Sequence, residues 1–168
     1  AMVFQEALLF DTTVYKNVAS GLKFRGVGRE EIKARVAEQL ELFGISRLKN
    51  RSARTLSGGE AQRTSLARAF ATNPEILFLD EPFASLDPPT RESLMEDVEQ
   101  VLRRAHTTTI ITTHDRSEAL RLSTRIAVMN QGRILQVGTP AEVMYHPVDE
   151  FVAAFVGIET IITGEVAG

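Results

Sequence analysis

Residues 76–82 read ILFLDEP, a short apolar run followed by two carboxylates and a proline. A strand made from this run would be apolar on both of its faces. Strands of that kind are typical of parallel sheets with both faces covered. We therefore expect a parallel-sheet strand over residues 76–80, which places Asp80 and Glu81 at its carboxyl end.

Strand and helix patterns alternate along the rest of the chain. Strands are predicted over residues 2–5, 107–114, 125–130 and 133–138, the last two as a hairpin around Gln131-Gly132. Helices are predicted over residues 14–24, 29–43 with Gly44 as the C-cap, 58–72, 89–105, 115–122, 140–145 and 148–156. This order of elements predicts an α/β fold with a mostly parallel sheet.

The length of 168 residues suits a single domain. Within it we expect three parts. They are a helical subdomain over about residues 12–72, a core from residues 1–11 and 73–138, and C-terminal helices with the start of an extension over residues 139–168.

The composition excludes several classes of protein. The formal net charge of -3 gives no general attraction to nucleic acid, so no nucleic-acid partner is expected. The chain has no cysteine, which excludes disulfides and thiolate metal sites. No apolar run approaches the roughly 20 residues that span a bilayer, so we expect no direct membrane insertion. Any role at a membrane must come through a partner.

Two glycines occupy the first turn of the helix that follows Ser57. Ser57 and Glu60 form the S-x-x-E pattern of a capping box, which predicts a well-capped helix. Capping alone leaves Gly58 and Gly59 unexplained, because glycine costs about 1 kcal/mol relative to alanine in a helix. A helix N-terminus without side chains exposes free N–H groups to an anion. We therefore favour a phosphate-binding role for this helix end.

Three polar side chains stand at the predicted ends of strands: Gln5, Asp80 and His114. Ligands of such sheets bind at the carboxyl ends of the strands, so we expect the three side chains to lie close together there. Asp80 there suits a Mg²⁺ ligand, and Glu81 suits a general base acting on water. Ordinary alternatives exist, because acidic pairs at strand exits are often only solvated. A histidine after a strand is more often a structural hydrogen-bond partner.

In their order, these residues resemble the nucleotide-binding domain of ATP-binding-cassette (ABC) transporters. LSGGE at residues 56–60 resembles the signature motif of the family, and ILFLDE at residues 76–81 resembles its Walker B motif. Gln5 is similar to the Q-loop glutamine, SLD at residues 85–87 to the D-loop, and His114 to the switch histidine. Five motifs in the order of the family make chance agreement negligible.

The resemblance implies a role for each matched residue. Asp80 and Gln5 would hold Mg²⁺, Glu81 would activate the attacking water, and His114 would contact the γ-phosphate of ATP. The remaining matched residues would bind nucleotide across a subunit interface, facing ATP held by the opposite subunit: Ser57, Gly58, Gly59, Glu60 and Asp87.

The resemblance also implies a cytoplasmic subunit at the inner face of the cell membrane, bound to a transmembrane permease. In the family, the segment after the Q-loop glutamine meets the membrane subunit, which here is LLFDTTVYKNV at residues 8–18. Packing of these apolar residues within the helical subdomain is an equally good explanation.

The glycine-rich phosphate loop of the family is missing, since no G-x-x-x-x-G-K-[ST] pattern occurs in the sequence. The chain resembles the C-terminal two-thirds of such a domain. We expect the isolated chain neither to bind ATP in the usual way nor to hydrolyse it. In the family, the phosphate-loop strand lies between the strands expected here at residues 107–114 and 125–130. Its absence would leave unpaired edges. We expect rearrangement of the sheet, or its cover in a homodimer or domain-swapped oligomer.

We interpret the chain as the C-terminal part of the ATP-hydrolysing subunit of an ABC importer that energises solute uptake. The tail at residues 146–166 resembles the exit toward the regulatory domain of importers, and residues 8–19 with 156–161 favour tungstate or molybdate as the solute. A non-hydrolytic fragment that dimerises or binds the permease is the alternative. A piece of a DNA-repair or chromosome-structure ATPase is disfavoured, because sustained heptads and net positive charge are lacking.

Overall fold

The computed structural model describes residues 1–104 and 107–158. The chain divides into two compact units, Ala1–Thr113 and His114–Gly168, and each is described by itself. The first holds β1 (Met2–Val3), α1 (Val14–Phe24), α2 (Arg29–Leu42), the 3-10 turns η1 (Ser46–Leu48) and η2 (Ala53–Thr55), α3 (Gly58–Ala71), β2 (Ile76–Asp80), α4 (Pro88–Arg104) and β3 (Thr108–Thr112). The second holds α5 (Arg116–Leu122), β4 (Ile126–Asn130), β5 (Arg133–Gly138), α6 (Pro140–Tyr145) and α7 (Glu150–Phe155).

The helices and strands predicted from the sequence are all present, with small shifts at their ends. The first strand stops at Val3, so Gln5 lies in the following loop. There the carbonyl oxygen of Phe4 accepts a hydrogen bond from the side chain of Gln62 rather than from a neighbouring strand. The extension expected beyond residue 158 lies outside the described residues.

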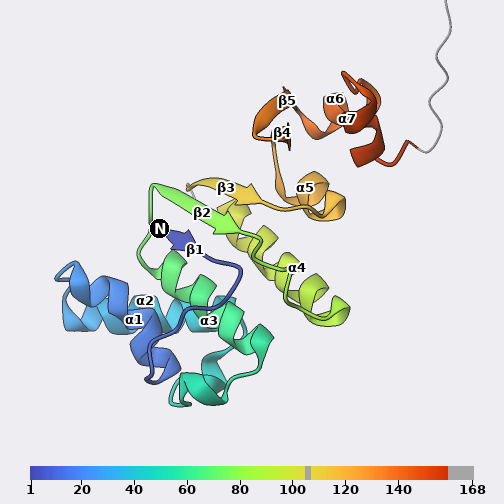
Figure 1. Ribbon diagram of the computed structural model, residues 1–168. Coiled ribbons are helices and arrows are strands. Elements are labelled where there is room, and N and C mark those ends of the chain that lie inside the picture. The colour runs from blue at the N-terminus through green and yellow to red at the C-terminus, as the bar shows by residue number, and fades with distance from the viewer. Residues whose placement is uncertain (105–106, 159–168) are drawn as a thin grey trace, which may run out of the picture. The chain divides into compact units, whose positions relative to one another are not determined.

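The first unit is built on a parallel sheet in the order β1-β2-β3, as expected (Figure 1). The register pairs Phe78 with Met2 on one side and with Ile110 on the other. Asp80 pairs with Thr112, so the carboxyl ends of β2 and β3 are level. Within residues 1–104 and 107–158, the outer edge of β3 has no strand partner. The oligomer expected to cover such an edge remains a prediction.

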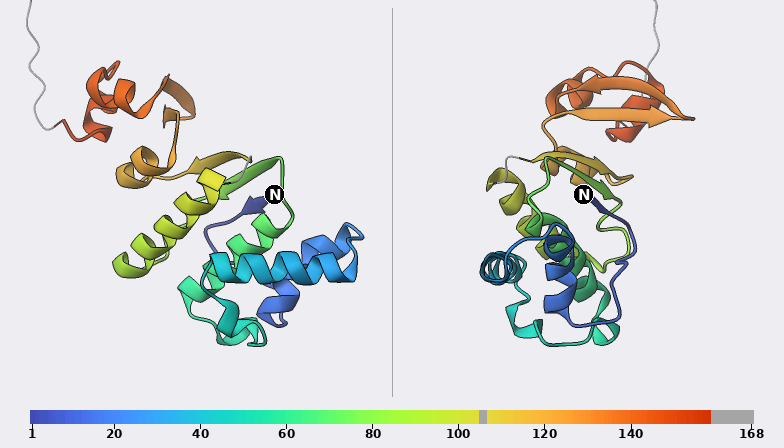
Figure 2. Two further views of the ribbon diagram at one scale, coloured as in Figure 1. Left: turned by 180° about the vertical axis from the view of Figure 1, so that it is seen from behind. Right: turned by 90° about the vertical axis from the view of Figure 1, so that its left-hand side faces the viewer.

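The expectation that both faces of this sheet are covered is wrong. Leu77 and Leu79 point to the buried face, whereas Ile76 and Phe78 are 49% and 43% exposed. The helices α3 and α4 lie on the same side of the sheet (Figures 1 and 2), where Leu94 and Val98 of α4 are fully buried. Because side chains alternate along a strand, helices on one side can bury only alternate residues. The apolar run shows that both faces of β2 are apolar, but it does not show which elements pack on each face.

The helices α1, α2 and α3 form a block with its own core, which includes Leu22, Phe43 and Phe70. The rings of Phe43 and Phe70 are 5.8 Å apart between centroids. α1 and α3 approach closely at Gly21, where an added Cβ would lie 2.6 Å from Cγ2 of Thr72. α2 ends at Leu42, and its C-cap is Phe43 rather than the predicted Gly44. Gly44 is the next residue and has φ +64°, the left-handed conformation that often follows a helix end.

The second unit is a hairpin of β4 and β5 with the short helices α6 and α7 packed against it. The turn is Gln131-Gly132, with φ values of +48° and +75°, as the sequence predicts. Its core is made of valines and one isoleucine: Ile126, Val128, Val143, Val152 and Val156. In the described parts of both units, no helix has the length and apolar character needed to cross a membrane.

Candidate functional site

The N-terminus of α3 is capped as the sequence predicts. The Ser57 hydroxyl oxygen accepts a hydrogen bond from the N–H of Glu60 at 3.3 Å, and the N–H of Ser57 donates to Oε2 of Glu60 at 2.9 Å. The same Oε2 lies 3.5 Å from Nη1 of Arg51. The carboxylate of Glu60 is therefore engaged in the cap and in an ion pair. This arrangement fixes the helix end that Ser57 and Gly58 present to solvent.

The two glycines of this helix end differ in their surroundings. A Cβ on Gly59 would lie 2.5 Å from Cγ2 of Thr90, in the first turn of α4. Packing of α3 against α4 thus accounts for Gly59. A Cβ on Gly58 would meet no atom within 4 Å. Gly58 therefore lacks a packing reason, and its bare backbone leaves room for a group from outside the chain.

The carboxyl end of β2 brings together the two predicted carboxylates and Thr112. The hydroxyl of Thr112 donates a hydrogen bond to Oδ1 of Asp80 at 2.6 Å, which orients this carboxylate. The N–H of Glu81 donates to the carbonyl oxygen of Thr112 at 3.0 Å. Glu81 has φ +43°, in the left-handed region that non-glycine residues rarely adopt. Strained backbone of this kind occurs often at functional sites, where it aims a side chain.

The loop that carries Gln5 is tied to the segment that follows Glu81. Nε2 of Gln62, in α3, lies 3.3 Å from the Phe4 carbonyl oxygen and 3.0 Å from that of Pro82. The hydroxyl of Ser85 donates to the carbonyl oxygen of Gln5 at 3.3 Å. The structure thus places the chain segments of Gln5 and Glu81 side by side.

Asp87 caps α4. Its Oδ2 accepts a hydrogen bond from the N–H of Thr90 at 3.2 Å, and the bonds from the Thr90 side chain and backbone hold the pKa of Asp87 below its usual range. Asp87 is exposed and remains charged at neutral pH. His114 lies two residues after the last residue of β3 and precedes Asp115, the N-cap of α5. It is the first residue of the second unit.

The donor set fits a magnesium ion that is held mainly by phosphate and water. No group of three or more acidic, histidine or cysteine side chains able to hold a metal occurs in the described ranges 1–104 and 107–158. One oriented carboxylate, Asp80, matches the way Mg²⁺ binds in nucleotide sites, with few protein ligands. The structure thus offers part of a shell rather than a complete protein cage.

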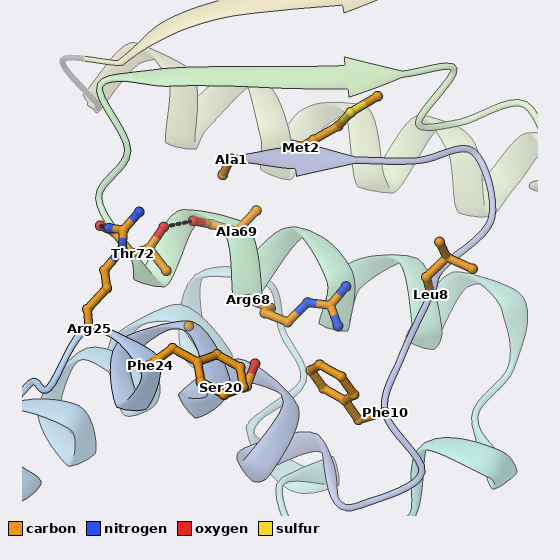
Figure 3. Close-up of a pocket in the computed structure, with 11 residues that line it drawn as sticks. Ala1, Met2, Leu8, Phe10, Ser20, Phe24, Arg25, Arg68, Ala69 and Thr72 are labelled. Atoms are coloured by element: carbon orange, nitrogen blue, oxygen red, sulfur yellow. Dashed lines mark hydrogen bonds between the residues drawn. The ribbon is translucent and has the colours of Figure 1, made fainter.

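A groove with a volume of about 480 Å³ is lined by residues of β1, the loop after it, α1 and α3. Figure 3 shows its walls: the loop with Leu8 and Phe10, the side of α1 with Ser20 and Phe24, and α3 with Arg68. Its lining is mostly apolar, and four of its large apolar side chains are exposed: Met2, Leu8, Phe10 and Phe24. The loop falls within the segment 8–18 that the resemblance assigns to permease contact.

Asn17 holds the loop of this groove in place. Its side chain is fully buried and bonds both backbone groups of Phe10, accepting from the N–H at 2.8 Å and donating to the carbonyl oxygen at 3.0 Å. It also donates to the carbonyl oxygen of Thr13 at 3.1 Å. The exposed ring of Phe10 is therefore carried by an anchored backbone.

The sequence reasoning missed four residues of these sites: Asn17, Gln62, Arg68 and Thr112. For Asn17 and Gln62, the sequence does contain a signal, because each is a polar residue on the buried face of a helix. A buried polar side chain needs a hydrogen-bond partner. Nothing local in the sequence names the partner, because Phe4 and Pro82 are distant from Gln62 along the chain. Arg68 and Thr112 carry no distinguishing pattern.

The chain matches known proteins in the regions just described. The family model described as "ABC transporter" matches residues 1–84. The chain is 46% identical over 99% of its length to the Fe(3+) ions import ATP-binding protein FbpC of Streptomyces coelicolor, of which it covers 48%. It is 45% identical over 100% of its length to the molybdate/tungstate import ATP-binding protein WtpC of Pyrococcus abyssi, of which it covers 49%.

The fold also matches a solved structure, that of CbiO1 from Clostridium perfringens, part of the ABC transporter complex CbiONQ. The TM-score is 0.79 at 32% identity, over 87% of this chain and 59% of that one. The chain spans about half the length of the curated relatives named above. The family model covers half of the chain, and the chain therefore belongs to the ABC transporter family, with the α/β fold of its ATP-binding domain.

Proposed function

We propose that this chain is part of the ATP-hydrolysing subunit of an ABC importer, which energises solute uptake through a membrane permease. The observation that carries the proposal is the pair Asp80 and Glu81 at the carboxyl end of β2, oriented by Thr112 and joined to the Gln5 loop by Gln62. The relatives FbpC and WtpC are both named import ATP-binding proteins, which supports the importer reading.

Each residue at this strand end has a chemical task in the proposal. Asp80 and Gln5 would hold Mg²⁺, which neutralises phosphate charge when it is bound with ATP. Glu81 accepts the proton of a water whose oxygen attacks the γ-phosphorus, while the bond from that phosphorus to the bridging oxygen breaks and ADP leaves. The hydrogen bond from Thr112 fixes one oxygen of Asp80 and leaves the other available. His114 would contact the γ-phosphate.

The capped end of α3 would serve a second copy of the subunit. Ser57, Gly58 and Gly59 would bind the γ-phosphate of ATP held by the other copy, with Glu60 maintaining the cap and Asp87 at the same interface. The open space at Gly58 supports this role, because no packing within the chain requires a glycine there. The unpaired edge of β3 and the exposed Phe78 further support a homodimer or domain-swapped oligomer.

The groove between the Leu8–Phe10 loop and α1 would receive the permease. Exposed apolar side chains around a groove are typical of protein–protein contacts. We propose that docking here holds the subunit at the inner face of the cell membrane. Among solutes we propose tungstate or molybdate, which the name of the WtpC relative supports. The FbpC relative, named for Fe(3+), is equally similar, so an uptake assay must decide.

A non-hydrolytic role is the second candidate for the 168-residue chain by itself. The observation in its favour is the lack of a G-x-x-x-x-G-K-[ST] pattern in the sequence. In this reading, the isolated chain binds the permease or dimerises without turnover. MgATP turnover by the purified chain alone would contradict it.

Uptake by membrane vesicles tests the main proposal. Vesicles that hold the permease are prepared with and without this protein, supplied with MgATP on the face that it binds, and given radiolabelled molybdate, tungstate or Fe³⁺. ATP-dependent uptake of one of these solutes that requires this protein supports the proposal. A permease that neither binds this protein nor depends on it for uptake contradicts it.

A further inference from the structure

The capped end of α3 holds a negative charge beside its free hydrogen-bond donors. The cap uses the N–H groups of Ser57 and Glu60, and no side chain of the described residues accepts a hydrogen bond from the N–H of Gly58 or Gly59. Those two N–H groups and the helix dipole favour an anion. The carboxylate of Glu60 lies in the same turn, with its Oε2 2.9 Å from the nitrogen of Ser57. A like charge this close opposes the approach of a phosphate.

Arg51 is the cation that faces this carboxylate. Nη1 of Arg51 lies 3.5 Å from Oε2 of Glu60. Its other two nitrogens bond Thr55: Nη2 donates to the carbonyl oxygen at 2.7 Å, and Nε donates to the hydroxyl oxygen at 3.2 Å. Within the described residues, no other cation is paired with Glu60. The guanidinium therefore spans the turn that leads into α3 and supplies the counter-charge of the cap.

The backbone of Arg51 is bonded on both sides. Its N–H donates to the carbonyl oxygen of Leu48 at 2.8 Å, and its carbonyl oxygen accepts from the N–H of Val14, the first residue of α1, at 3.0 Å. Two residues further on, the N–H of Ala53 donates to the carbonyl oxygen of Thr12 at 2.9 Å. The side chain of Arg51 thus starts from a fixed backbone position beside the end of α3.

We infer that Arg51 is a positioning residue for the phosphate of ATP: it neutralises Glu60 and holds the turn before Ser57, so that the free N–H groups of α3 can accept an anion. This inference rests on the proposed role of the α3 end at the ATP of a second copy. It adds a residue outside the signature motif and explains how a carboxylate is accommodated there. Without Arg51, the charge of Glu60 would oppose the γ-phosphate. The stability of the fold would change little, because an exposed ion pair contributes little to it.

MgATP-dependent association of the whole ATP-hydrolysing subunit, of which we propose this chain is part, tests the inference. The subunit carries Glu81→Gln throughout, so that bound ATP is not turned over. Sedimentation measures the Kd of the homodimer in MgATP and in MgADP, which lacks the γ-phosphate and gives the baseline. Arg51→Gln is expected to raise the Kd in MgATP by about tenfold or more and to leave the baseline unchanged. The loss should shrink at high salt, because salt screens exposed charges.

The same substitution in a Glu60→Gln background separates charge from packing. Glu60→Gln removes the charge and keeps an oxygen that can accept from the N–H of Ser57. In that background, Arg51→Gln is expected to change the Kd by less than about twofold, because no uncompensated carboxylate remains. Arg51→Lys keeps the charge without the planar fork of the guanidinium, and it should lose less association than Arg51→Gln.

A matched control and a check of folding complete the experiment. Arg35→Gln on α2 removes a comparable exposed ion pair, with Glu31, and is expected to leave association unchanged. Thermal unfolding verifies that each variant is folded. Arg51→Met, which is also uncharged, takes the place of Arg51→Gln if that variant does not fold.

The outcomes separate this inference from the proposed function. Wild-type association of Arg51→Gln in MgATP, or an equal loss with and without Glu60→Gln, overturns the inference and leaves the proposed function intact. A loss that is as large in MgADP assigns Arg51 to folding alone and overturns the inference as well. No MgATP-dependent association of the subunit that carries only Glu81→Gln overturns the proposed role of the α3 end at a second copy.

Discussion

Nε2 of Gln62 lies 3.0 Å from the carbonyl oxygen of Pro82 and 3.3 Å from that of Phe4. Through these two bonds a single buried side chain of α3 joins the loop of Gln5 to the segment that follows Glu81. The same helix begins at the Ser57 cap and carries Arg68 at the groove. α3 thus connects the proposed nucleotide-facing end, the strand-end carboxylates and the proposed permease groove.

Gln62→Leu is expected to destabilise the first unit by about 1–3 kcal/mol, because it leaves polar backbone groups without their partner. Urea unfolding measures this change. Gln100→Leu on the exposed face of α4 serves as the matched control, with an expected change within about 0.5 kcal/mol. Equal effects of the two substitutions would show that the bonds of Gln62 contribute nothing.

The two glycines of the signature are expected to respond differently to alanine. Gly59→Ala should lower stability by about 1–3 kcal/mol, since its Cβ would crowd Cγ2 of Thr90. Gly58→Ala has open space and should leave stability unchanged, while reducing ATP turnover of the complex with the permease if a phosphate approaches there. Unfolding in urea and ATPase assays separate the two effects.

Thr90→Ser provides the control for Gly59→Ala, because it removes Cγ2 and keeps the hydroxyl near Asp87. The double variant should recover much of the stability that Gly59→Ala loses. A Gly59→Ala protein as stable as the wild type would contradict the close approach of α3 and α4.

Asn17→Ala is expected to reduce stability by about 1–3 kcal/mol and to weaken binding to the permease, because the backbone of Phe10 loses both of its side-chain bonds. Urea unfolding and vesicle binding measure the two quantities. Asn50→Ala, at an exposed position, is the control. If Asn17→Ala loses stability but binds the permease as tightly as the wild type, the Phe10 loop is not part of the docking surface.

Local features of this fold could be predicted from the sequence because their causes are local. The Ser57–Glu60 capping box, Gly44 at the end of α2 and the Gln131-Gly132 turn each involve residues that are close along the chain. The position of Asp80 at the end of a strand could likewise be predicted from the apolar residues 76–79 that precede it.

The features that the sequence did not predict depend on distant contacts. Gln62 and Arg68 have ordinary helical surroundings in the sequence, and their roles come from Pro82, Phe4 and Phe10, which the fold brings to them. The exposed face of the sheet was mispredicted for a related reason. An apolar residue such as Phe78 shows that this face of the sheet is suited to packing against another element. It does not show that an element of this chain packs there.

The second unit is expected to lose stability in acid through Glu142. Hydrogen bonds from the N–H of Thr139 at 2.7 Å and from its hydroxyl at 3.0 Å lower the pKa of Glu142. A lowered pKa in the folded state means that this stabilisation is present at neutral pH and is lost as the pH falls below about 4. Glu142→Gln should therefore be less stable at pH 7 and should show a flatter acid dependence, as measured by urea unfolding of α6 resonances in NMR spectra. An unchanged acid dependence would exclude Glu142 as its source.

MgATP turnover by the complex of the permease with the whole ATP-hydrolysing subunit of which we propose this chain is part, wild type against Glu81→Gln, tests the central claim most directly. Loss of a general base is expected to lower turnover by about 100-fold or more, while permease binding stays unchanged because Glu81 lies outside the groove. Glu75→Gln, at an exposed position before β2, is the control and should retain full turnover. Turnover by Glu81→Gln within about twofold of the wild type would contradict the role assigned to this carboxylate.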